Sequence, residues 1–176
     1  MSPRVAIVGG GLGGLAAALF LKQAGVNVTV YEQAPALHEV GAGIVISPNM
    51  VRPLERLGLA AKLEAFAVRL EAAWEFRRWE DGRVLSVQRM EACRELYGAD
   101  CYVAHRADLM GLFRDALPPE VLHLDQRCVG VEQDSHTVEL TFENRAGQRT
   151  RVTADAVIAA DGIHSTLRPI ASPTDA

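Results

Sequence analysis

Three glycines and one acidic residue near the start of the chain have the spacing of a dinucleotide site. Gly9, Gly11 and Gly14 follow a β-type run in G-x-G-x-x-G order, and Glu32 comes 18 residues after Gly14. Gly9 would permit a tight turn, Gly11 would let a pyrophosphate approach the backbone, and Gly14 would let a helix pack closely on a sheet. A carboxylate at the Glu32 position accepts hydrogen bonds from an adenosine ribose and disfavours a 2′-phosphate. The pattern therefore favours FAD or NAD over NADP.

The surrounding sequence predicts the elements that would hold these residues. An uncharged strand at residues 5–8 leads into the glycines, a helix begins near Leu12, and a strand at 27–31 delivers Glu32. The helix N-terminus would bind the pyrophosphate through free N–H groups and the positive end of its dipole. Two other interpretations stay open, a helix–sheet turn without a ligand and a membrane segment. The uncharged run 5–21 is a little short of the roughly 20 residues that span a bilayer, and it contains five glycines.

The composition is that of an ordinary globular protein. The 176 residues are enough for one well-cored domain, and 49% are hydrophobic and 23% charged. A net charge of −4 gives no reason to expect nucleic acid or a membrane surface as a partner. Cys93, Cys101 and Cys128 lack C-x-x-C spacing, and the chain has no secretory signal, so we expect free thiols in the cytoplasm. Neither cysteine nor histidine spacing predicts a metal site.

The middle of the chain predicts short elements and one hairpin. The run Gly41-Ala42-Gly43 is too glycine-rich for a stable strand start and suggests backbone close to a ligand or another element. Ser47-Pro48 predicts the start of a helix that Gly58 ends, and a second short helix follows. Asp81-Gly82 suits a tight turn between two strands. We expect residues 70–104 to form a β excursion toward the substrate side.

The last third predicts a helix from His105-Arg106 to the prolines at 118 and 119, and then a short strand. Strands at 128–133, 137–142 and 149–153 have the alternation of an antiparallel meander. Residues 156–160 are uniformly small and apolar, which predicts a central position in a parallel sheet. The sequence thus predicts an α/β fold: a Rossmann-like FAD/NAD(P)-binding βαβ sheet with an antiparallel meander and a small hairpin.

The dipeptide Asp161-Gly162 follows this last strand and is expected to turn directly into a helix. Ligands of open α/β sheets lie at the carboxyl ends of the strands, so Asp161 would face the same crevice as the glycines. The alternative is an ordinary Asp-Gly turn in which Ser165 caps a helix.

Several of these segments together resemble a known family. The GGGLGG loop with Glu32, the His105-Arg106-x-x-Leu109 segment and the ADGIHSTLR segment occur in the same order in the flavin-dependent aromatic hydroxylases, the para-hydroxybenzoate hydroxylase-like class A monooxygenases. The GAGI-x-I-x-PN run looks most like the branch with 6-hydroxynicotinate 3-monooxygenase and salicylate hydroxylase. The resemblance covers essentially the whole chain and implies that residues 1–176 are the FAD-binding domain of such an enzyme, truncated before its C-terminal half.

The resemblance implies a set of FAD-binding residues. They are Gly9, Gly11, Leu12, Gly13, Gly14, Glu32, Gln33, Val45, Arg106, Cys128, Asp161 and Gly162. The glycine loop would hold the pyrophosphate, and Glu32 with Gln33 would lie at the ribose and adenine. Arg106 would contact FAD from the start of its helix, unless it is simply a solvated arginine of the first turn.

The remaining members of this set have weaker or different implied roles. The backbone at Cys128 would lie beside the adenine, and Asp161 with Gly162 would serve FAD binding and the handling of NAD(P)H. Val45 could touch the flavin, but it stands where the nicotinate hydroxylase carries a histidine thought to act as a base. No catalytic residue is therefore predicted.

The implied function is the FAD-binding portion of a monooxygenase that uses NADH or NADPH to hydroxylate a small aromatic substrate. Family members are more than twice as long, and most of their substrate-facing sheet lies in the half that this chain lacks. The alternative is a non-catalytic FAD- or NAD-binding module, which a second chain or self-association would complete. We expect no partnership with nucleic acid or a membrane.

Overall fold

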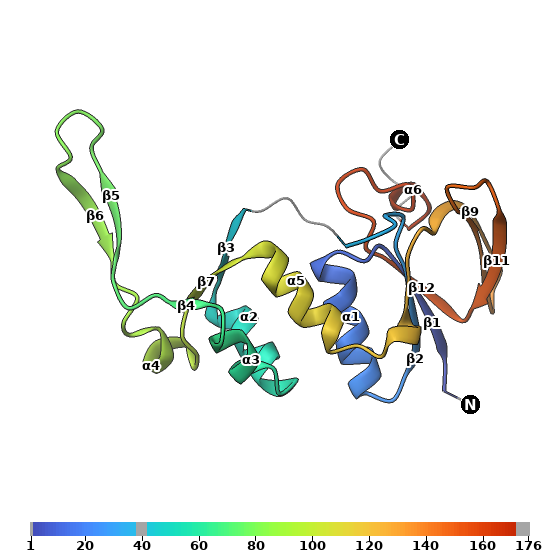
Figure 1. The fold of residues 1–176 in the computed structure, drawn as a ribbon, viewed down its shortest axis with the longest axis horizontal. Helices are drawn as coiled ribbons and strands as arrows, with labels where there is room; N and C mark the ends of the chain where they lie inside the picture. The colour runs from blue at the N-terminus through green and yellow to red at the C-terminus, as the bar shows by residue number, and fades with distance from the viewer. Residues whose placement is uncertain (1, 38–41, 172–176) are drawn as a thin grey trace. The chain divides into compact units, whose positions relative to one another are not determined.

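The protein folds into two compact units. The computed structural model describes residues 2–37 and 42–171 (Figure 1). One unit contains the described residues up to 37 together with those from 113 onward, and the other contains residues 42–112. The glycine loop belongs to the first unit and the predicted hairpin to the second.

A four-stranded parallel sheet forms the centre of the first unit. Its order is β12-β1-β2-β8, with bounds Ala156–Ala159, Arg4–Val8, Asn27–Tyr31 and Leu122–His123. In β1 the side chains of Ala6, Ile7 and Val8 are all buried, as is usual in a parallel strand that is covered on both faces. The prediction of a mixed α/β fold around a parallel sheet is confirmed.

Helix α1 (Leu12–Gln23) follows the glycine loop and returns the chain to the start of β2. Gly14, Leu15, Ala18 and Leu19 are its buried residues, and their spacing places them on one face of the helix. Burying a leucine contributes roughly 1.5–3 kcal/mol to the free energy of unfolding. The helix ends at Gln23 with Ala24 as its C-cap, and Gly25 adopts a left-handed φ of 75° that few other residues would tolerate.

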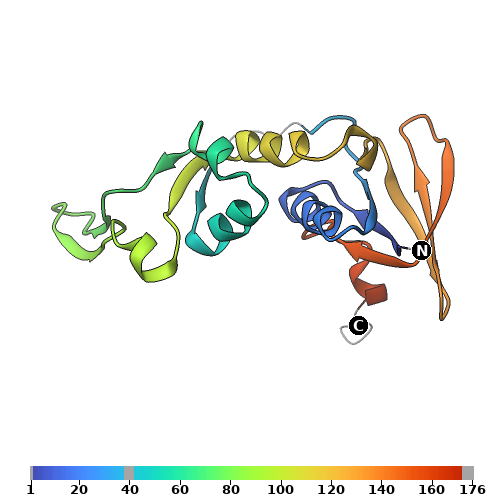
Figure 2. The ribbon, with the colours of Figure 1, turned by 90° about the horizontal axis from the view of Figure 1, so that it is seen from below.

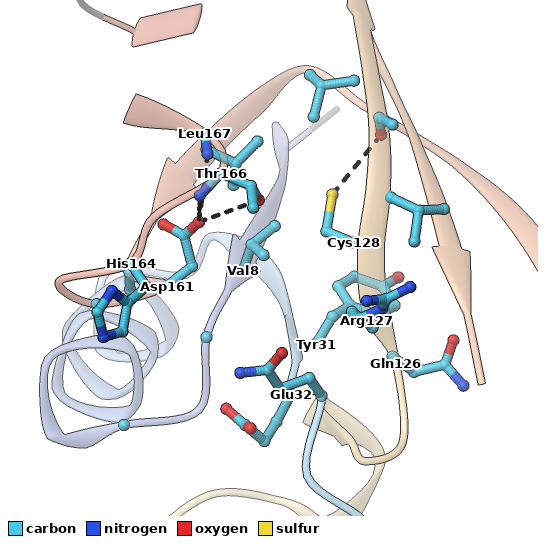
Figure 3. Close-up of a pocket in the computed structure, with 18 of the residues that line it drawn as sticks. Val8, Tyr31, Glu32, Gln126, Arg127, Cys128, Asp161, His164, Thr166 and Leu167 are labelled. Atoms are coloured by element: carbon cyan, nitrogen blue, oxygen red, sulfur yellow. Dashed lines mark hydrogen bonds between the residues drawn. The ribbon is translucent and has the colours of Figure 1, made fainter. Parts of the chain in front are cut away.

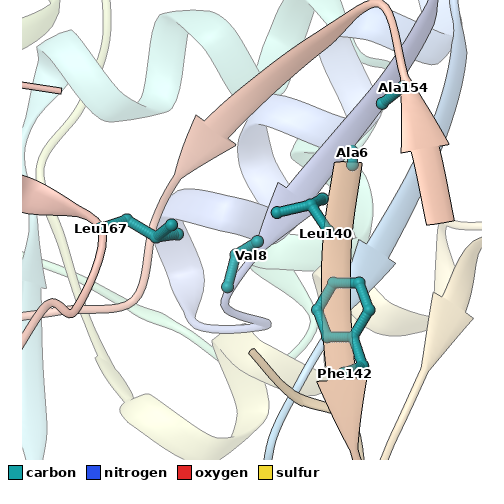
Figure 4. Packing of buried hydrophobic residues seen from close by; sticks show 6 residues of the cluster. All are labelled: Ala6, Val8, Leu140, Phe142, Ala154 and Leu167. Atoms are coloured by element: carbon teal, nitrogen blue, oxygen red, sulfur yellow. The ribbon is translucent and has the colours of Figure 1, made fainter. Parts of the chain in front are cut away.

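The antiparallel meander that the alternating sequence predicted is present, and it covers one face of the parallel sheet. Its strands, in the order β11-β10-β9, are Arg149–Ala154, Val138–Glu143 and Arg127–Gln133. Leu140 and Phe142 project from β10 and pack with Ala6 and Val8 of β1 (Figure 4). This cluster fixes the meander beside the carboxyl ends of the parallel strands.

The position of β12 corrects the sequence prediction. The strand was expected at the centre of the parallel sheet, but it pairs with β1 and forms an edge of the described sheet. The glycine loop packs directly on the residue after this strand: a Cβ atom at Gly9 would lie 2.2 Å from the carbonyl oxygen of Ala160, and one at Gly14 would lie 3.4 Å from the Ala160 side chain.

The second unit is built on the antiparallel sheet β3-β7-β4, with bounds Gly43–Ile46, Tyr102–His105 and Val68–Arg69. Its helices are α2 (Pro48–Arg56), α3 (Ala60–Glu64), α4 (Cys93–Tyr97) and the first part of the helix that follows β7. Gly43 does begin a strand, contrary to expectation, because its pairing with His105 offsets the low strand propensity of glycine. Gly41 lies outside the described residues.

The predicted hairpin is confirmed, but its connection is longer than the tight Asp-Gly turn that was expected. The strands β5 (Trp74–Arg77) and β6 (Val84–Gln88) are joined by residues 78–83, in which Gly82 has a positive φ of 72° and Asp81 does not. In the two views at right angles the hairpin projects from the rest of its own unit (Figures 1 and 2).

The remaining helices are short or follow a strand directly. Helix α5 (Arg106–Asp115) starts immediately after β7, and η1 (Pro119–Val121) precedes β8. The final helix, α6 (Arg168–Ala171), begins only after a loop, so Asp161-Gly162 does not turn directly into a helix as expected. No helix of the described chain is long and apolar enough to cross a membrane.

Candidate cofactor site

A pocket of about 760 Å³ opens at the carboxyl ends of β1, β2 and β12 in the first unit (Figure 3). Three segments supply most of its wall: the glycine loop with the end of β2, the start of β9, and the loop after β12. The lining residues are Val8, Gly9, Gly11, Tyr31, Glu32, Gln33, Gln126, Arg127, Cys128, Val129, Gly130, Val131, Ala160, Asp161, Gly162, Ile163, His164, Thr166, Leu167 and Ile170. The volume falls within the range of small-molecule and cofactor sites.

The N-terminus of α1 is open at this pocket. Gly11 precedes the helix without a side-chain cap, and no acidic residue stands in the first turn. A Cβ atom at Gly11 or Gly13 would meet nothing within 4 Å. The first N–H groups of a helix have no partner within it, and the helix dipole favours an anion there. These features fit the pyrophosphate of a dinucleotide.

Two other glycines serve the fold. Gly9 has a φ of 110°, which a side chain would strain, and a Cβ atom at Gly14 would lie 1.9 Å from the carbonyl oxygen of Gly9. At both positions another part of the backbone lies so close that a side chain has no room. The sequence reasoning assigned a tight turn to Gly9 and close packing to Gly14, and the geometry agrees.

The carboxylate of Glu32 is held in place by backbone groups. The N–H of Gly10 donates to one carboxylate oxygen at 2.6 Å, and the N–H of Ala34 donates to the other at 2.8 Å. Glu32 itself donates from its backbone N–H to the carbonyl of His123 at 2.9 Å. Each carboxylate oxygen has a further lone pair, so the side chain can still accept a hydrogen bond from a ribose hydroxyl.

Tyr31 lines the pocket, although the sequence gave no reason to select it. Its ring stacks on Phe142 with centroids 4.2 Å apart and on His123 with centroids 5.4 Å apart. Burial raises the pKa of the Tyr31 phenol and outweighs the opposite effect of a hydrogen bond with Thr29. The phenol is therefore neutral at physiological pH. Its two partners come from β8 and β10, which only folding brings to β2.

Asp161 organises the loop after β12. Its carboxylate accepts hydrogen bonds from the Ser165 hydroxyl at 2.6 Å and from the Thr166 and Leu167 N–H groups at 2.8 and 3.3 Å. Burial acts to raise the Asp161 pKa, but these hydrogen bonds outweigh it, and the pKa lies below its ordinary value. The carboxylate is therefore ionised at neutral pH.

Both interpretations of Asp161-Gly162 describe part of this loop. Ser165 accepts a hydrogen bond from the Arg168 N–H at 3.0 Å and so caps α6, as the structural alternative proposed. Asp161 and Gly162 nevertheless line the pocket beside the glycine loop. The turn and the pocket wall are thus the same segment.

Cys128 lies on β9, where several neighbours that the sequence did not single out also face the pocket. Its thiol contacts the carbonyl of Gly130 at 3.6 Å, and burial raises its pKa. The group is a neutral thiol rather than a nucleophilic thiolate. Gln126 and Arg127 precede it in the lining, and no motif in the sequence marks them.

Two predicted residues lie in the second unit, outside the pocket lining. Val45 pairs with Val103 in the β3-β7 ladder and is 42% exposed, and the N–H of Arg106 donates to Ala42 at the start of α5. Their roles toward a flavin remain predictions. Leu12, Gly13 and Gly14 follow Gly11 in the first turn of α1, and these three predicted residues also lie outside the pocket lining. Within the described residues, no cluster of His, Cys, Asp or Glu could hold a metal ion.

Comparison with known proteins identifies the group to which this site belongs. The family described as FAD binding domain matches residues 3–173. The chain is 45% identical to 3-amino-4-hydroxybenzoate 2-monooxygenase PtmB3 of Streptomyces platensis, over 94% of this chain and 41% of that protein. It is 38% identical to 6-hydroxynicotinate 3-monooxygenase of Pseudomonas fluorescens, over 95% of this chain and 42% of that protein.

A solved structure with bound FAD has the same fold. Klebsiella pneumoniae HpxO complexed with FAD and uric acid superimposes with a TM-score of 0.80 at 28% identity, over 96% of this chain and 41% of that one. The chain spans about two fifths of the length of the relatives it matches. The resemblance that the motifs indicated is confirmed. The chain belongs to the family described as FAD binding domain, and it is similar to the corresponding part of several aromatic flavin monooxygenases.

Proposed function

We propose that this chain binds FAD in the pocket of the first unit and forms the cofactor-binding portion of an NAD(P)H-dependent monooxygenase that hydroxylates a small aromatic ring. The observation that carries the proposal is the uncapped N-terminus of α1, which opens on the pocket opposite a positioned carboxylate. An anionic pyrophosphate and a ribose are the chemical groups that such a pair of features recognises.

The residues of the chain would divide the binding between them. Gly11 and Gly13 leave the backbone accessible to the pyrophosphate, and Glu32 accepts hydrogen bonds from the adenosine ribose. The start of β9 around Cys128 provides a wall for the adenine. Asp161 holds the loop that shapes the remaining side of the pocket. Val45 and Arg106 belong to the second unit, and their roles toward FAD are implied by the family resemblance alone.

When bound, FAD supplies the oxidation–reduction chemistry, accepting electrons from NADH or NADPH and passing them to oxygen. The chain contributes binding and orientation. The aromatic substrate class is supported by the relatives, whose names specify monooxygenases of an aminohydroxybenzoate and a hydroxynicotinate. The three free cysteines are consistent with a reducing cytoplasm.

A second candidate is an FAD- or NAD-binding module that is inactive until another chain completes it. Three apolar residues of the pocket lining favour it: Ile163 is 81% exposed, Ile170 is 41% exposed and Val129 is 40% exposed. Exposed apolar side chains around a pocket are typical of a surface that another segment covers. An uncovered flavin would also be open to water, which monooxygenase chemistry must exclude.

The test is the visible absorption of the purified chain after incubation with FAD and removal of the excess. We expect retained flavin close to one per chain, and about tenfold or greater weakening of FAD binding in Glu32→Ala, because a charge-assisted hydrogen bond is lost. Glu132→Ala is the matched control, since Glu132 is exposed on β9 and lies outside the pocket lining.

The outcomes separate the two candidates. Equal flavin retention in wild type and Glu32→Ala, with both folded by circular dichroism, would contradict the site. NAD(P)H oxidation that depends on an aromatic compound, with ring hydroxylation, would exclude the inactive module. Retained flavin without such turnover would favour the module.

A further inference from the structure

The segment that joins β8 to β9 holds the backbone of Glu32 through both of its polar groups. The N–H of Glu32 donates to the carbonyl of His123 at 2.9 Å, and its carbonyl accepts from the N–H of Gln126 at 2.8 Å. The N–H of Asp125, which precedes Gln126, donates to the carbonyl of Ala34 at 3.0 Å. The position of the acid at the cofactor pocket therefore depends on residues 123–126.

Ala34 connects Asp125 to the side chain of Glu32. The carbonyl of Ala34 accepts the hydrogen bond from Asp125, while its N–H donates to a carboxylate oxygen of Glu32 at 2.8 Å. The N–H of Gly10 donates to the other carboxylate oxygen at 2.6 Å. A shift of Ala34 would therefore weaken one of the hydrogen bonds that fix the carboxylate.

Asp125 has a backbone conformation that few side chains adopt. Its φ is 55°, and within the described residues it is the one residue other than glycine with a positive φ. Aspartate and asparagine tolerate this left-handed conformation better than other non-glycine residues, whereas alanine adopts it at a cost. The conformation sets the angle between the N–H groups of Asp125 and Gln126, and both of these groups donate to residues 32–34.

The Asp125 side chain ties the same segment to the turn between β10 and β11. Its carboxylate accepts a hydrogen bond from the N–H of Arg145 at 3.1 Å, and the Arg145 Nε lies 3.9 Å from it. Asp125 itself lies outside the lining of the cofactor pocket, whereas Glu32 and Gln126 belong to it. Any effect of Asp125 on a ligand in this pocket must therefore pass through its neighbours.

We propose that Asp125 is a positioning residue of the cofactor site, which holds Glu32 in the geometry that receives the adenosine ribose. This inference rests on the proposed function, because that function assigns the ribose of FAD to Glu32. A group that is fixed before the ligand arrives loses little freedom on binding. If only a fraction of the molecules hold Glu32 correctly, the apparent Kd rises by the inverse of that fraction.

The first test is the FAD affinity of three Asp125 variants, measured by flavin fluorescence titration of the whole chain. Asp125→Ala loses the carboxylate and strains the left-handed φ, so we expect the Kd to rise about three- to tenfold. Asp125→Asn keeps an oxygen acceptor for the Arg145 N–H and tolerates the conformation, so it should restore most of the affinity. Asp125→Gly adopts the conformation without strain and should lie between the two.

A double-mutant cycle asks whether Asp125 acts through Glu32. We expect Asp125→Ala to weaken FAD binding in the wild-type background and to have little further effect in Glu32→Ala, because the group that it positions is gone. A residue that only supports the fold would weaken binding equally in both backgrounds. If Asp125→Ala does not fold, the cycle is measured with Asp125→Gly.

A second measurement needs no flavin. In Asp125→Ala, hydrogen exchange measured by NMR should accelerate at the N–H groups of Gly10 and Ala34, because both donate to the Glu32 carboxylate. Exchange at the N–H of Gly9 should be unchanged, since this group donates to the carbonyl of Tyr31 at 2.8 Å.

Asp134→Ala is the matched control. Asp134 lies in the turn between β9 and β10, where it accepts hydrogen bonds from the N–H groups of His136 and Thr137 at 2.7 Å each. It is outside the pocket lining. We expect this variant to lower the free energy of unfolding without changing the Kd for FAD or the exchange at Gly10.

Three results would overturn the proposal: a folded Asp125→Ala variant with the FAD affinity of wild type, equal weakening in the two backgrounds of the cycle, or unchanged exchange at Gly10 and Ala34. Failure of the proposed function gives a different result. In that case Glu32→Ala would bind FAD like wild type, while the exchange measurement would still report whether Asp125 holds the Glu32 carboxylate.

Discussion

The glycines at the start of α1 have different neighbours and therefore different functions. At Gly14 a methyl group would overlap the carbonyl oxygen of Gly9, whereas at Gly11 it would project into open space. Gly11 also has a φ of −70°, which alanine adopts readily. Gly14 is needed for packing, and Gly11 leaves room for a ligand.

This contrast predicts that alanine at Gly14 lowers the stability of the fold, whereas alanine at Gly11 weakens FAD binding. Gly14→Ala should reduce the free energy of unfolding by at least about 1–3 kcal/mol, because the added methyl group overpacks the loop. Gly11→Ala should leave the stability of the flavin-free chain unchanged and weaken FAD binding, because its methyl group occupies the approach of the pyrophosphate. Urea unfolding without FAD and flavin titration measure the two effects. Equal stability losses in both variants would contradict the distinction.

At the scale of an element, the segment from Asp161 to Arg168 acts as one hydrogen-bonded loop. Asp161 accepts from Ser165, Thr166 and Leu167, and the Arg168 side chain donates to the carbonyl of Ile163 at 3.2 Å. Leu167 is buried in the cluster that also contains Val8. The buried Leu167 side chain therefore packs the loop against the sheet, and hydrogen bonds to the Asp161 carboxylate hold the loop backbone.

The lowered pKa of Asp161 predicts a dependence of stability on pH. The folded chain binds this proton more weakly than the unfolded chain, so the ionised carboxylate stabilises the fold above the ordinary Asp value of 3.8. That stability is lost as the pH falls through the lowered folded pKa. The difference in unfolding free energy between wild type and Asp161→Asn should be constant from about pH 5 to 7 and shrink below about pH 4.

Urea unfolding at a series of pH values measures this difference. Asp134 and Asp155 also have lowered pKa values, through hydrogen bonds from backbone N–H groups, but they occur in both proteins and cancel in the comparison. A difference that does not change with pH would show that Asp161 contributes no charge-dependent stability.

At the scale of the whole molecule, the cofactor pocket is confined to one of the two units. Every residue that lines it comes from the first unit, and the hairpin belongs to the second. A ligand that binds only the folded state stabilises the structure that holds it. Binding of FAD should therefore act unequally on the two units.

We expect FAD at about a hundredfold its Kd to raise the free energy of opening of the first unit by about 2.7 kcal/mol. Hydrogen exchange should slow in β1, β2 and β9, while exchange in β5 and β6 should be unchanged at a fixed chain concentration. Mass spectrometry of peptides from each unit measures this directly. Slowing confined to the hairpin would place the flavin elsewhere.

The sequence by itself determined the local part of the site. G-x-G-x-x-G spacing and the acid after β2 depend on contacts within one βαβ unit, and the structure places Gly11 and Glu32 at one pocket. The meander and the hairpin were also predictable, because alternation and an Asp-Gly turn are properties of short segments. The family resemblance was carried by the same kind of local motif.

Only the tertiary structure decided which distant residues share the pocket and what their side chains contact. Tyr31 is positioned by rings from β8 and β10, and β12 lies at a sheet edge although its composition predicted the centre. The physical reason is that a sequence pattern reports the preferences of neighbours along the chain, whereas strand order and side-chain partners depend on packing between segments far apart in it.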